Sequence, residues 1–373
     1  MRRVATGGWG WIPAGFSVLK QVEWPVMIEN AANADAPIAA AKPRRRWFQY
    51  RLRSLMLLML LVGIGMTWLV AIKHRAERQK EAVEIVVKNG GMVLYDYQEY
   101  TLPSGATNFS DNAQPPGPAW LRTLLGDDFF TNVVGTRIVT QAGLDQLAKL
   151  PQIQRLELGG AAVTDSILDQ LNELSRLDRL GLENTSVTDN GMKKLAGLTQ
   201  LKWLILNGNT GITDDGLKRI AGLRQLEYLD LSLSNVTDAG LKHLRLMTHL
   251  QELRLGNTRI TGAGLRELVE LPQLHNLYVN DIQLNDTSAE PLSRLGQLQK
   301  LDLDATQITD AGLEPLGKLK SLRGLALYRT HVTDEGIAKL QQALPHCHIE
   351  REPFHGRRLE SGAARQGGSW NDR

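Results

Sequence analysis

The sequence of 373 residues predicts an α/β fold: a curved repeat solenoid with a parallel β-sheet on its concave face and helices on its convex face, preceded by one transmembrane helix. Two observations lead to this prediction. A Leu-x-x-Leu-x-Leu pattern recurs from Leu177 to Leu322 in steps of 24 residues, once 25. A run of 18 uncharged residues, 55–72, lies far upstream of it. A fixed period of this length indicates units that bury their apolar faces only against their neighbours.

Changes in composition along the chain divide it into six segments. We expect disorder at both ends, where no long apolar run occurs. The repeats account for most of the remainder, so the chain is one solenoid with appendages rather than two or three ordinary domains. The expected segments are a disordered leader at 1–41, a basic juxtamembrane segment at 42–54, a transmembrane helix at 55–72, a linker and N-terminal cap at 73–128, an array of about nine repeats at 129–349 and a disordered tail at 350–373.

The apolar run 55–72 has the length and the flanks of a membrane span. As a helix it reaches about 27 Å at ~1.5 Å per residue, which suits the hydrocarbon core of a bilayer. Residues 1–75 hold 11 basic and 3 acidic side chains, so the basic charge lies beside the apolar run. Trp47, Tyr50 and Trp68 lie near its ends, where aromatic residues anchor spans at the interface. No small-x-small cleavage site follows the run, which argues against a cleaved signal peptide.

The basic flanks also bear on orientation. Six basic residues precede the span, whereas Lys73, Arg75, Arg78 and Lys80 follow it. Because cytoplasmic flanks carry the excess of Lys and Arg, this bias favours a cytoplasmic N-terminus and an array on the extracytoplasmic side. The reverse orientation would make the chain an intracellular adaptor tethered to the membrane.

Residues 73–128 contain short apolar stretches ahead of the first repeat. Ala76–Lys88 predicts an amphipathic helix, 92–97 a strand and 120–125 a short helix. Because the first unit of a solenoid exposes one end of the core, we expect these elements to cover it. The alternative is an independent small-molecule domain in 80–128, which is also where an enzyme site would have to lie.

The residue pattern of each repeat predicts a strand, a turn and a helix. After the strand comes a position usually filled by Thr, which we place at Thr185, Thr210, Thr258, Thr306 and Thr330. A Thr-Asp pair such as Thr213-Asp214 follows; the Thr suits a helix N-cap and the Asp suits the positive end of the helix dipole. A small residue such as Gly240 lets the helix start approach its neighbour. Thr261-Gly262, which lacks the Asp, and Asn285-Asp286 predict irregular units.

This pattern resembles the leucine-rich-repeat superfamily. Its Thr-Asp-x-Gly-Leu helix start, as at 309–313, is similar to the cysteine-containing subclass known from F-box substrate adaptors. Thr stands where that subclass has Cys, and no F-box-like segment lies upstream. A basic-flanked anchor followed by such repeats resembles bacterial membrane-anchored leucine-rich-repeat proteins. The resemblance implies a non-enzymatic protein-interaction module.

Neighbouring strands align equivalent residues into ladders across the concave sheet. The ladders around the second leucine of each strand place Trp, Tyr and Arg, the residue types enriched in binding hot spots, near the middle of the array. The alternative is that these side chains only stabilise the sheet across its strands. The candidate binding residues are Trp203, Ile205, Tyr228, Asp230, Glu252, Arg254 and Tyr278.

Other chemistry is weakly represented. No phosphate-binding glycine loop, HExxH helix or nucleophile elbow occurs. His346, Cys347 and His348 are adjacent, so an extended chain points them to opposite faces, and we expect no metal there. Asp302 and Asp304 share a strand face, which could hold Ca²⁺ weakly or be a solvated acidic spot. We therefore expect no catalytic residue and no cofactor.

The expected partners are the lipid bilayer and a protein or cell-envelope ligand. Nucleic acid is not expected, because the array from 129 to 349 holds 23 basic and 25 acidic side chains and no basic stripe.

Overall fold

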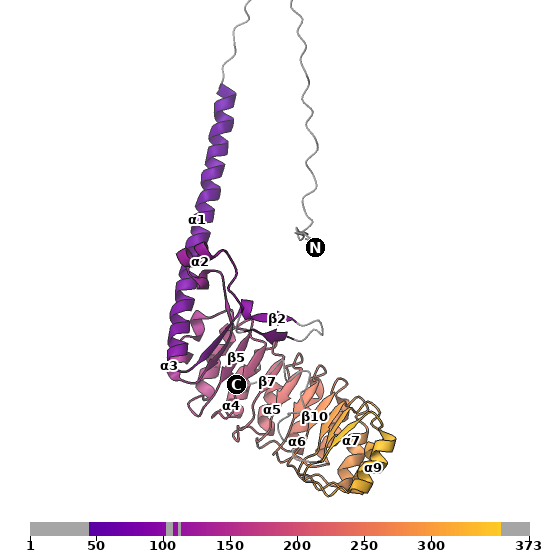
Figure 1. Ribbon diagram of the computed structural model, residues 1–373. Coiled ribbons are helices and arrows are strands. Elements are labelled where there is room, and N and C mark those ends of the chain that lie inside the picture. Colours follow the sequence, from indigo (N-terminus) through magenta and orange to yellow (C-terminus); the bar gives the residue numbers. More distant parts are fainter. Residues whose placement is uncertain (1–44, 102–106, 111–112, 352–373) are drawn as a thin grey trace, which may run out of the picture. The chain divides into compact units, whose positions relative to one another are not determined.

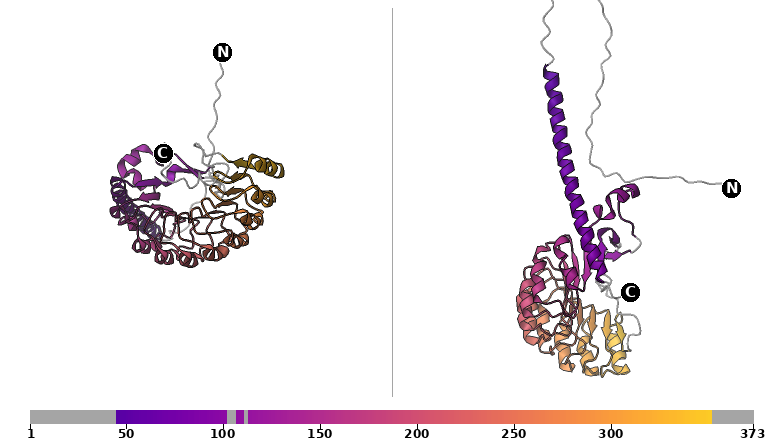
Figure 2. Two further views of the ribbon diagram at one scale, coloured as in Figure 1. Left: turned by 90° about the horizontal axis from the view of Figure 1, so that it is seen from below. Right: turned by 90° about the vertical axis from the view of Figure 1, so that its left-hand side faces the viewer.

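The computed structural model describes residues 45–101, 107–110 and 113–351. The chain forms two compact units, Met1–Val62 and Gly63–Arg373, and the second contains the whole repeat array. Within that unit the strands line the inner side of a curved array and the helices its outer side (Figures 1 and 2).

The elements follow one another in the predicted alternation of strand and helix. The strands are β1 (Met92–Tyr95), β2 (Glu99–Thr101), β3 (Thr107–Phe109), β4 (Val133–Ile138), β5 (Arg155–Leu158), β6 (Arg179–Gly181), β7 (Trp203–Ile205), β8 (Tyr228–Asp230), β9 (Glu252–Arg254), β10 (Asn276–Tyr278), β11 (Lys300–Asp302), β12 (Gly324–Ala326) and β13 (His348–Glu350). The α-helices are α1 (Arg45–Lys88), α2 (Ala119–Leu125), α3 (Gln141–Leu144), α4 (Asp189–Leu195), α5 (Asp214–Ile220), α6 (Asp238–Leu241), α7 (Ala289–Ser293), α8 (Asp310–Leu316) and α9 (Asp334–Ala343). The 3₁₀ helices are η1 (Asp96–Gln98), η2 (Asp127–Phe129), η3 (Leu147–Lys149), η4 (Asp165–Glu173), η5 (Lys242–Leu246), η6 (Gly264–Glu270) and η7 (Asp286–Ser288).

One sheet of 11 strands runs through the array. Its order is β1-β4-β5-β6-β7-β8-β9-β10-β11-β12-β13; β1 is antiparallel to β4, and the later pairs are parallel. The repeat leucines point inward and form one continuous core, with Leu204, Leu229 and Leu253 fully buried. This is the leucine-rich-repeat solenoid that the period predicts.

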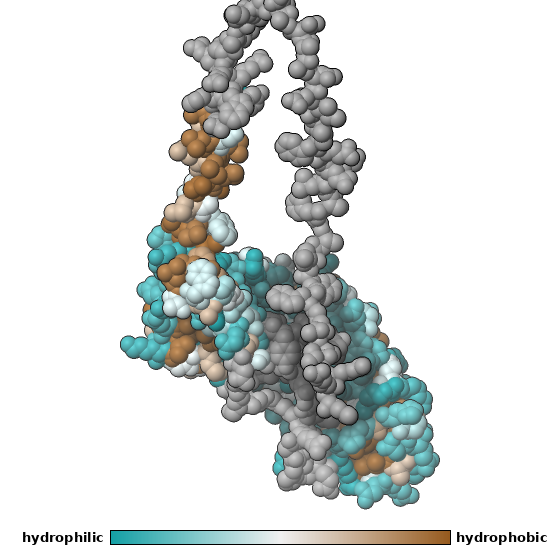
Figure 3. Space-filling model, turned by 45° about the horizontal axis from the view of Figure 1, so that its top comes forward, coloured by the Kyte–Doolittle hydropathy of each residue, from teal (hydrophilic) through white to brown (hydrophobic). Residues whose placement is uncertain are grey.

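Helix α1 differs from the expectation of two separate helices. The apolar run and the amphipathic segment after it form one helix of 44 residues, because Lys73, His74 and Arg75 between them contain no helix breaker. It is long and apolar enough to cross a membrane, with a mean hydropathy of 2.5 in its most apolar window. Its apolar side chains form the brown surface in Figure 3, whereas the array surface is mostly teal.

The C-terminal part of α1 packs against the start of the array. Ala82 and Val86 are buried in the core that also contains Val133 of β4. Gln79 is 5% exposed; its amide donates to the Thr131 carbonyl and accepts from the Val133 backbone N–H. These contacts, together with β1 on the edge of β4, cover the first repeat, in the place where the sequence predicts a cap.

In the described repeats, the aspartate at the start of a helix bonds to the Thr of the next repeat, except in the last repeat. In one such pair, Asp214 accepts from the Thr237 backbone N–H at 2.8 Å and from the Thr237 hydroxyl at 2.6 Å. We call this arrangement the Asp–Thr bridge. The sequence predicts only a helix-dipole role for the aspartate, so its main structural partner was missed. The bridges in the described repeats are Asp165–Thr188, Asp189–Thr213, Asp214–Thr237, Asp238–Thr261, Asp286–Thr309 and Asp310–Thr333.

The bridge explains the glycine at the helix start. A Cβ on Gly240 would lie 2.4 Å from the Asp214 carboxylate oxygen, closer than any carbon side chain tolerates. Thr237 in turn caps α6, because its hydroxyl accepts from the Ala239 N–H. The bridge, the cap and the glycine therefore form one unit of packing between repeats.

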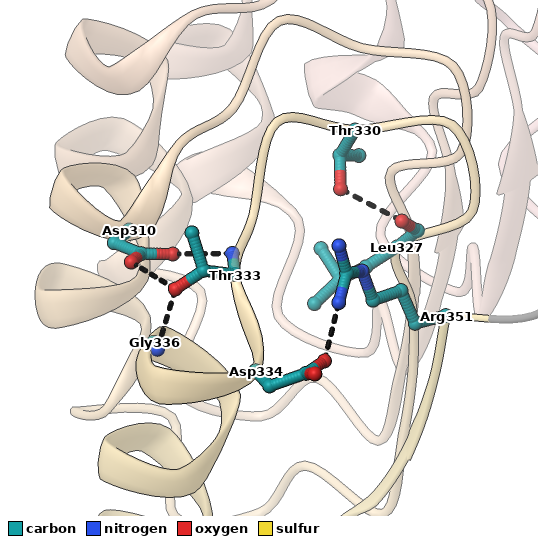
Figure 4. Close-up of polar contacts among 7 residues, drawn as sticks. All are labelled: Asp310, Leu327, Thr330, Thr333, Asp334, Gly336 and Arg351. Atoms are coloured by element: carbon teal, nitrogen blue, oxygen red, sulfur yellow. Dashed lines mark hydrogen bonds and ion pairs between the residues drawn. The ribbon is translucent and has the colours of Figure 1, made fainter.

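Figure 4 shows the last Asp–Thr bridge of the described array and the different contact that the next aspartate makes. Asp310 bonds Thr333, whose hydroxyl accepts from the Gly336 N–H at 3.2 Å. Asp334, the equivalent aspartate of this repeat, forms an ion pair with Arg351 just after β13. In the described chain Arg351 therefore takes the place that Thr holds in every bridge.

The one step of 25 residues changes the expected position of a polar side chain. Asn209, not Thr210, fills the buried position after the strand: its amide donates to the Leu182 and Leu206 carbonyls at 2.6 and 2.8 Å. Its oxygen accepts from the Thr185 hydroxyl at 2.6 Å. The assignment of Thr210 was wrong because the extra residue shifts the chain by one position there.

Candidate binding surface on the concave sheet

The ladders across the concave sheet have the predicted register. Trp203 pairs with Tyr228 and Tyr228 with Glu252, on β7, β8 and β9. The second ladder contains the remaining candidates, in the order Ile205, Asp230, Arg254 and Tyr278. All seven candidate residues thus lie on four neighbouring strands, β7 to β10.

Five side chains from β6 to β10 form a row of two guanidinium groups and three aromatic rings, in which Arg179 and Arg254 flank a stacked pair of rings. The Trp203 and Tyr228 rings stack with their centroids 4.3 Å apart and their planes 2° apart. The Arg179 guanidinium carbon lies 4.7 Å from the Trp203 ring centroid. On the other side, that of Arg254 lies 5.3 Å from Tyr228 and 4.7 Å from Tyr278. We call these five residues the aromatic–arginine row.

A buried carboxylate fixes the position of Arg254. Glu252 is 2% exposed, and one of its oxygens accepts from Nε and Nη2 of Arg254 at 3.0 and 2.8 Å. Its other oxygen accepts from the Asn276 amide at 3.1 Å. Charge-assisted bonds of this kind hold a guanidinium in one orientation, here between two tyrosine rings.

The row is more buried than the sequence suggests. We expect an exposed Trp-Tyr-Ile cluster, but Trp203 is 8% and Tyr228 6% exposed. Each ring covers the face of the other, because their strands are adjacent and the rings are parallel. Cross-strand stabilisation, the alternative interpretation of these residues, therefore accounts for the two stacked rings. Ile205, Arg254 and Tyr278 are partly exposed and form the accessible part of the surface.

Burial shifts the acid–base behaviour of this surface toward neutral forms. It raises the pKa of Asp230 and Tyr228 above their ordinary values. On β11 burial raises the pKa of Asp302 to about 6. A carboxylate oxygen of Asp302 accepts from the Asp304 backbone N–H at 2.9 Å, so it is engaged in the local turn.

The structure brings no metal-binding group together in its described part, where no three His, Cys, Asp or Glu side chains cluster with suitable geometry. Cys347 is 4% exposed, and burial raises the pKa of its thiol to about 11. His348 is exposed and pairs with Glu350 at 3.0 Å. The cysteine therefore belongs to the end of the core.

A polar hollow of about 370 Å³ borders the row, and sequence reasoning missed it. Glu252 lines the hollow and bonds Arg254 of the row. The available signal was a third ladder, in the residues just before each strand, whose members are polar in four consecutive repeats. The lining includes Glu227, Gln251, His275, Asn276, Gln299 and Lys300.

Sequence reasoning also left Arg179 out of the candidate residues. Arg179 lies beside Trp203 in the same ladder. Because guanidinium groups stack on Trp rings, this pairing in the sequence could have added Arg179 to the candidates.

A search of curated proteins gives no match. Among solved structures, internalin C2 from Listeria monocytogenes is 28% identical with a TM-score of 0.42, and the likeness covers 56% of this chain and 84% of that one. A leucine-rich-repeat protein from Leptospira interrogans is 19% identical with a TM-score of 0.37, covering 55% and 68%. An internalin, inlF, from Listeria monocytogenes is 19% identical with a TM-score of 0.29, covering 62% and 92%.

The match to a family model decides the family. The model describes a leucine-rich repeat region and matches residues 144–356, more than half of the chain. Those residues contain the core leucines, the Asp–Thr bridges and the concave ladders described above. The chain belongs to the leucine-rich-repeat family.

Proposed function

We propose that this protein is a membrane-anchored interaction module that binds a protein or cell-envelope ligand on its concave face and performs no catalysis. The observation that carries the proposal is the aromatic–arginine row. Trp, Tyr and Arg are enriched at binding hot spots, and in this row Arg179, Arg254 and Tyr278 remain partly exposed on the scaffold of the two stacked rings.

The packing of the row supports a binding role because it is preorganised. Arg254 is held between Tyr228 and Tyr278 by Glu252, so little side-chain freedom remains to be lost when a ligand binds. Its side chain is still 27% exposed. A rigid, partly exposed guanidinium flanked by aromatic rings can receive a carboxylate, a carbonyl or an aromatic group of a partner.

The polar hollow extends the proposed surface. Its amide, carboxylate, imidazole and ammonium groups offer both hydrogen-bond donors and acceptors beside the row. A ligand that spans both would make apolar contacts over Ile205 and Tyr278 and polar contacts in the hollow.

The proposal includes an anchor and an orientation. The run 55–72 within α1 is the bilayer span, supported by its hydropathy and by the exposure of its side chains. The excess of basic residues before the span supports a cytoplasmic N-terminus, which places the array outside the cytoplasm.

The concave face is tested by placing a charge on its accessible part. We expect Ile205→Arg in the full-length protein to abolish recovery of a partner from solubilised membranes of the source cells, because it places a bulky charged side chain on the accessible part of the surface, in the ladder that also contains Arg254 and Tyr278. The matched control is Leu246→Arg, at a 51% exposed leucine in the helical layer, which should leave recovery unchanged. Thermal unfolding of both variants checks that each remains folded.

Equal recovery by the two folded variants would sink the concave-face proposal. Loss with Leu246→Arg and retention with Ile205→Arg would move the binding surface to the helical side of the array.

A further inference from the structure

Helix α2 carries an apolar face that the described chain does not cover. Leu124 is 72% and Trp120 69% exposed, more than any other large apolar side chain described, those of α1 included. They lie four residues apart and therefore on the same side of the helix. Two large apolar side chains next to each other form an exposed apolar patch, and contiguous patches of this kind mark contacts with a protein or a membrane.

The position of α2 indicates which of these it contacts. In Figure 1, α2 lies higher along α1 than the C-terminal part of that helix that packs on the array, and Figure 2 shows α2 standing clear of the helix. Asp128, in η2 directly after α2, accepts from the Gln79 amide of α1 at 3.0 Å. Gly126, between the two, donates to the Arg122 carbonyl at 2.8 Å, so α2 is joined closely to this contact.

The height of this contact along α1 matches the surface of a membrane. Gln79 follows Ile72, the end of the apolar run, by seven residues, which is about 10 Å of helix at ~1.5 Å per residue. The headgroup layer on each side of the hydrocarbon core is roughly 5–8 Å thick. Since α2 lies on the span side of Gln79, its exposed face is at the level of the headgroups if the run ends at the hydrocarbon boundary.

The charges and residue types at this level suit a lipid surface. Between the apolar run and Gln79, α1 carries Lys73, Arg75 and Arg78 and one acidic residue, Glu77, which pairs with Lys73; the net positive charge suits anionic headgroups. Trp is the side chain that most often occupies the interfacial layer, with its ring between apolar and aqueous surroundings.

We propose that the Trp120–Leu124 face of α2 inserts into the headgroup layer of the same bilayer that α1 crosses. The inference rests on the anchoring proposed above. It gives the protein a second membrane contact, so that the cap and the array are held in a fixed orientation to the bilayer rather than turning about a single helix.

Spin labels in the full-length protein test this contact. Cys347→Ala removes the only cysteine, and Leu124→Cys, Leu246→Cys or Met59→Cys then supplies one labelling site in each of three proteins. Each protein is reconstituted in liposomes of phosphatidylcholine and phosphatidylglycerol. Power-saturation EPR compares accessibility to oxygen, which concentrates in lipid, with accessibility to a water-soluble nickel chelate. Circular dichroism checks that all three retain the fold.

The expected oxygen-to-nickel ratio is several-fold higher at Leu124 and at Met59 than at Leu246, the matched exposed leucine of the array. A ratio at Leu124 equal to that at Leu246, with a high ratio at Met59, overturns the α2 contact and leaves the anchor intact. A low ratio at Met59 overturns the anchor and the contact together. Spin–spin broadening at Leu124 that disappears on dilution with unlabelled protein assigns the face to a second copy and also overturns the inference.

Discussion

At the scale of single residues, Asp214 and Asp215 make a natural comparison. Both lie in the first turn of α5, so both interact with its dipole. Only Asp214 also accepts the two bonds from Thr237 of the next repeat. Neighbouring carboxylates of equal charge thus have different structural roles, and the difference lies in contacts between repeats.

We expect Asp214→Ala to lower the free energy of unfolding by about 1.5–3 kcal/mol, the usual contribution of hydrogen bonds to a charged group. Asp215→Ala, the matched control, should cost only about 0.3–1 kcal/mol from the helix dipole. Urea titration of the detergent-solubilised protein measures both. If the two variants lose equal free energy of unfolding, the helix dipole and not the Asp–Thr bridge accounts for the recurring Thr-Asp pair in this chain.

Asp302 predicts a pH dependence of stability. Its folded-state pKa of about 6 is above the ordinary value of 3.8 because the carboxyl is buried. The folded state therefore binds the Asp302 proton more tightly than the unfolded state does. The free energy of unfolding that this proton contributes is fully present below about pH 4 and is lost as the pH rises through 6. The slope is at most about 1.4 kcal/mol per pH unit.

We expect Asp302→Asn to remove this component of the slope, since the amide is neutral and its oxygen can still accept from the Asp304 N–H. The variant should gain stability over the native protein at pH 7 and little at pH 4. Urea midpoints at pH 4, 5, 6 and 7 give the comparison. Parallel pH profiles for the two proteins would contradict the role of Asp302.

At the scale of elements, the irregular repeat shows how the bridge can be replaced. Gly262 occupies the position that the bridging Asp occupies in other repeats. In the next repeat, Ser288 occupies the position at which other repeats have the small Gly. The Asn285 N–H, which would bond the missing Asp, instead donates to the Ser288 hydroxyl at 3.3 Å. A Cβ on Gly262 would lie 2.1 Å from that hydroxyl, so the two positions have exchanged large for small.

The same exchange predicts a compensating pair elsewhere. Gly240→Ser alone should destabilise the array by about 1–3 kcal/mol, because its Cβ would clash with Asp214. Adding Asp214→Gly removes the clash and lets the new hydroxyl accept from the Thr237 N–H. We therefore expect the double variant to be more stable than the sum of the two single changes, as a double-mutant cycle of urea midpoints will show. Additive losses would mean that the two positions are not coupled.

At the scale of the whole molecule, α1 connects the proposed membrane span directly to the array. Its residues 76–88 are part of the cap, and Gln79 is bonded to the backbone that enters β4. The segments expected as a span and a separate linker helix are thus one element.

The proposed orientation predicts which compartment the array faces. In intact spheroplasts we expect added protease to digest the array. Adding basic residues after Lys80 should invert the orientation, and only in that variant should the array be fully protected. A cytoplasmic marker protein in the same sample should stay intact. Protection of the array in intact spheroplasts and digestion after lysis would contradict the orientation and favour the intracellular adaptor.

The solenoid, the strand of each repeat and the register of its ladders could all be predicted from the sequence, because the period of the leucines sets both the local geometry and the alignment of neighbouring units. The sequence also located Trp203, Tyr228 and Arg254 on one face. Three contacts became visible only in the folded molecule: the two rings bury each other, Glu252 orients Arg254, and Asn209 replaces Thr210. The structure also showed that Asp214 bonds to the next repeat. These are contacts between side chains of different repeats, and their geometry depends on how closely the packed units approach, which no pattern within one unit specifies.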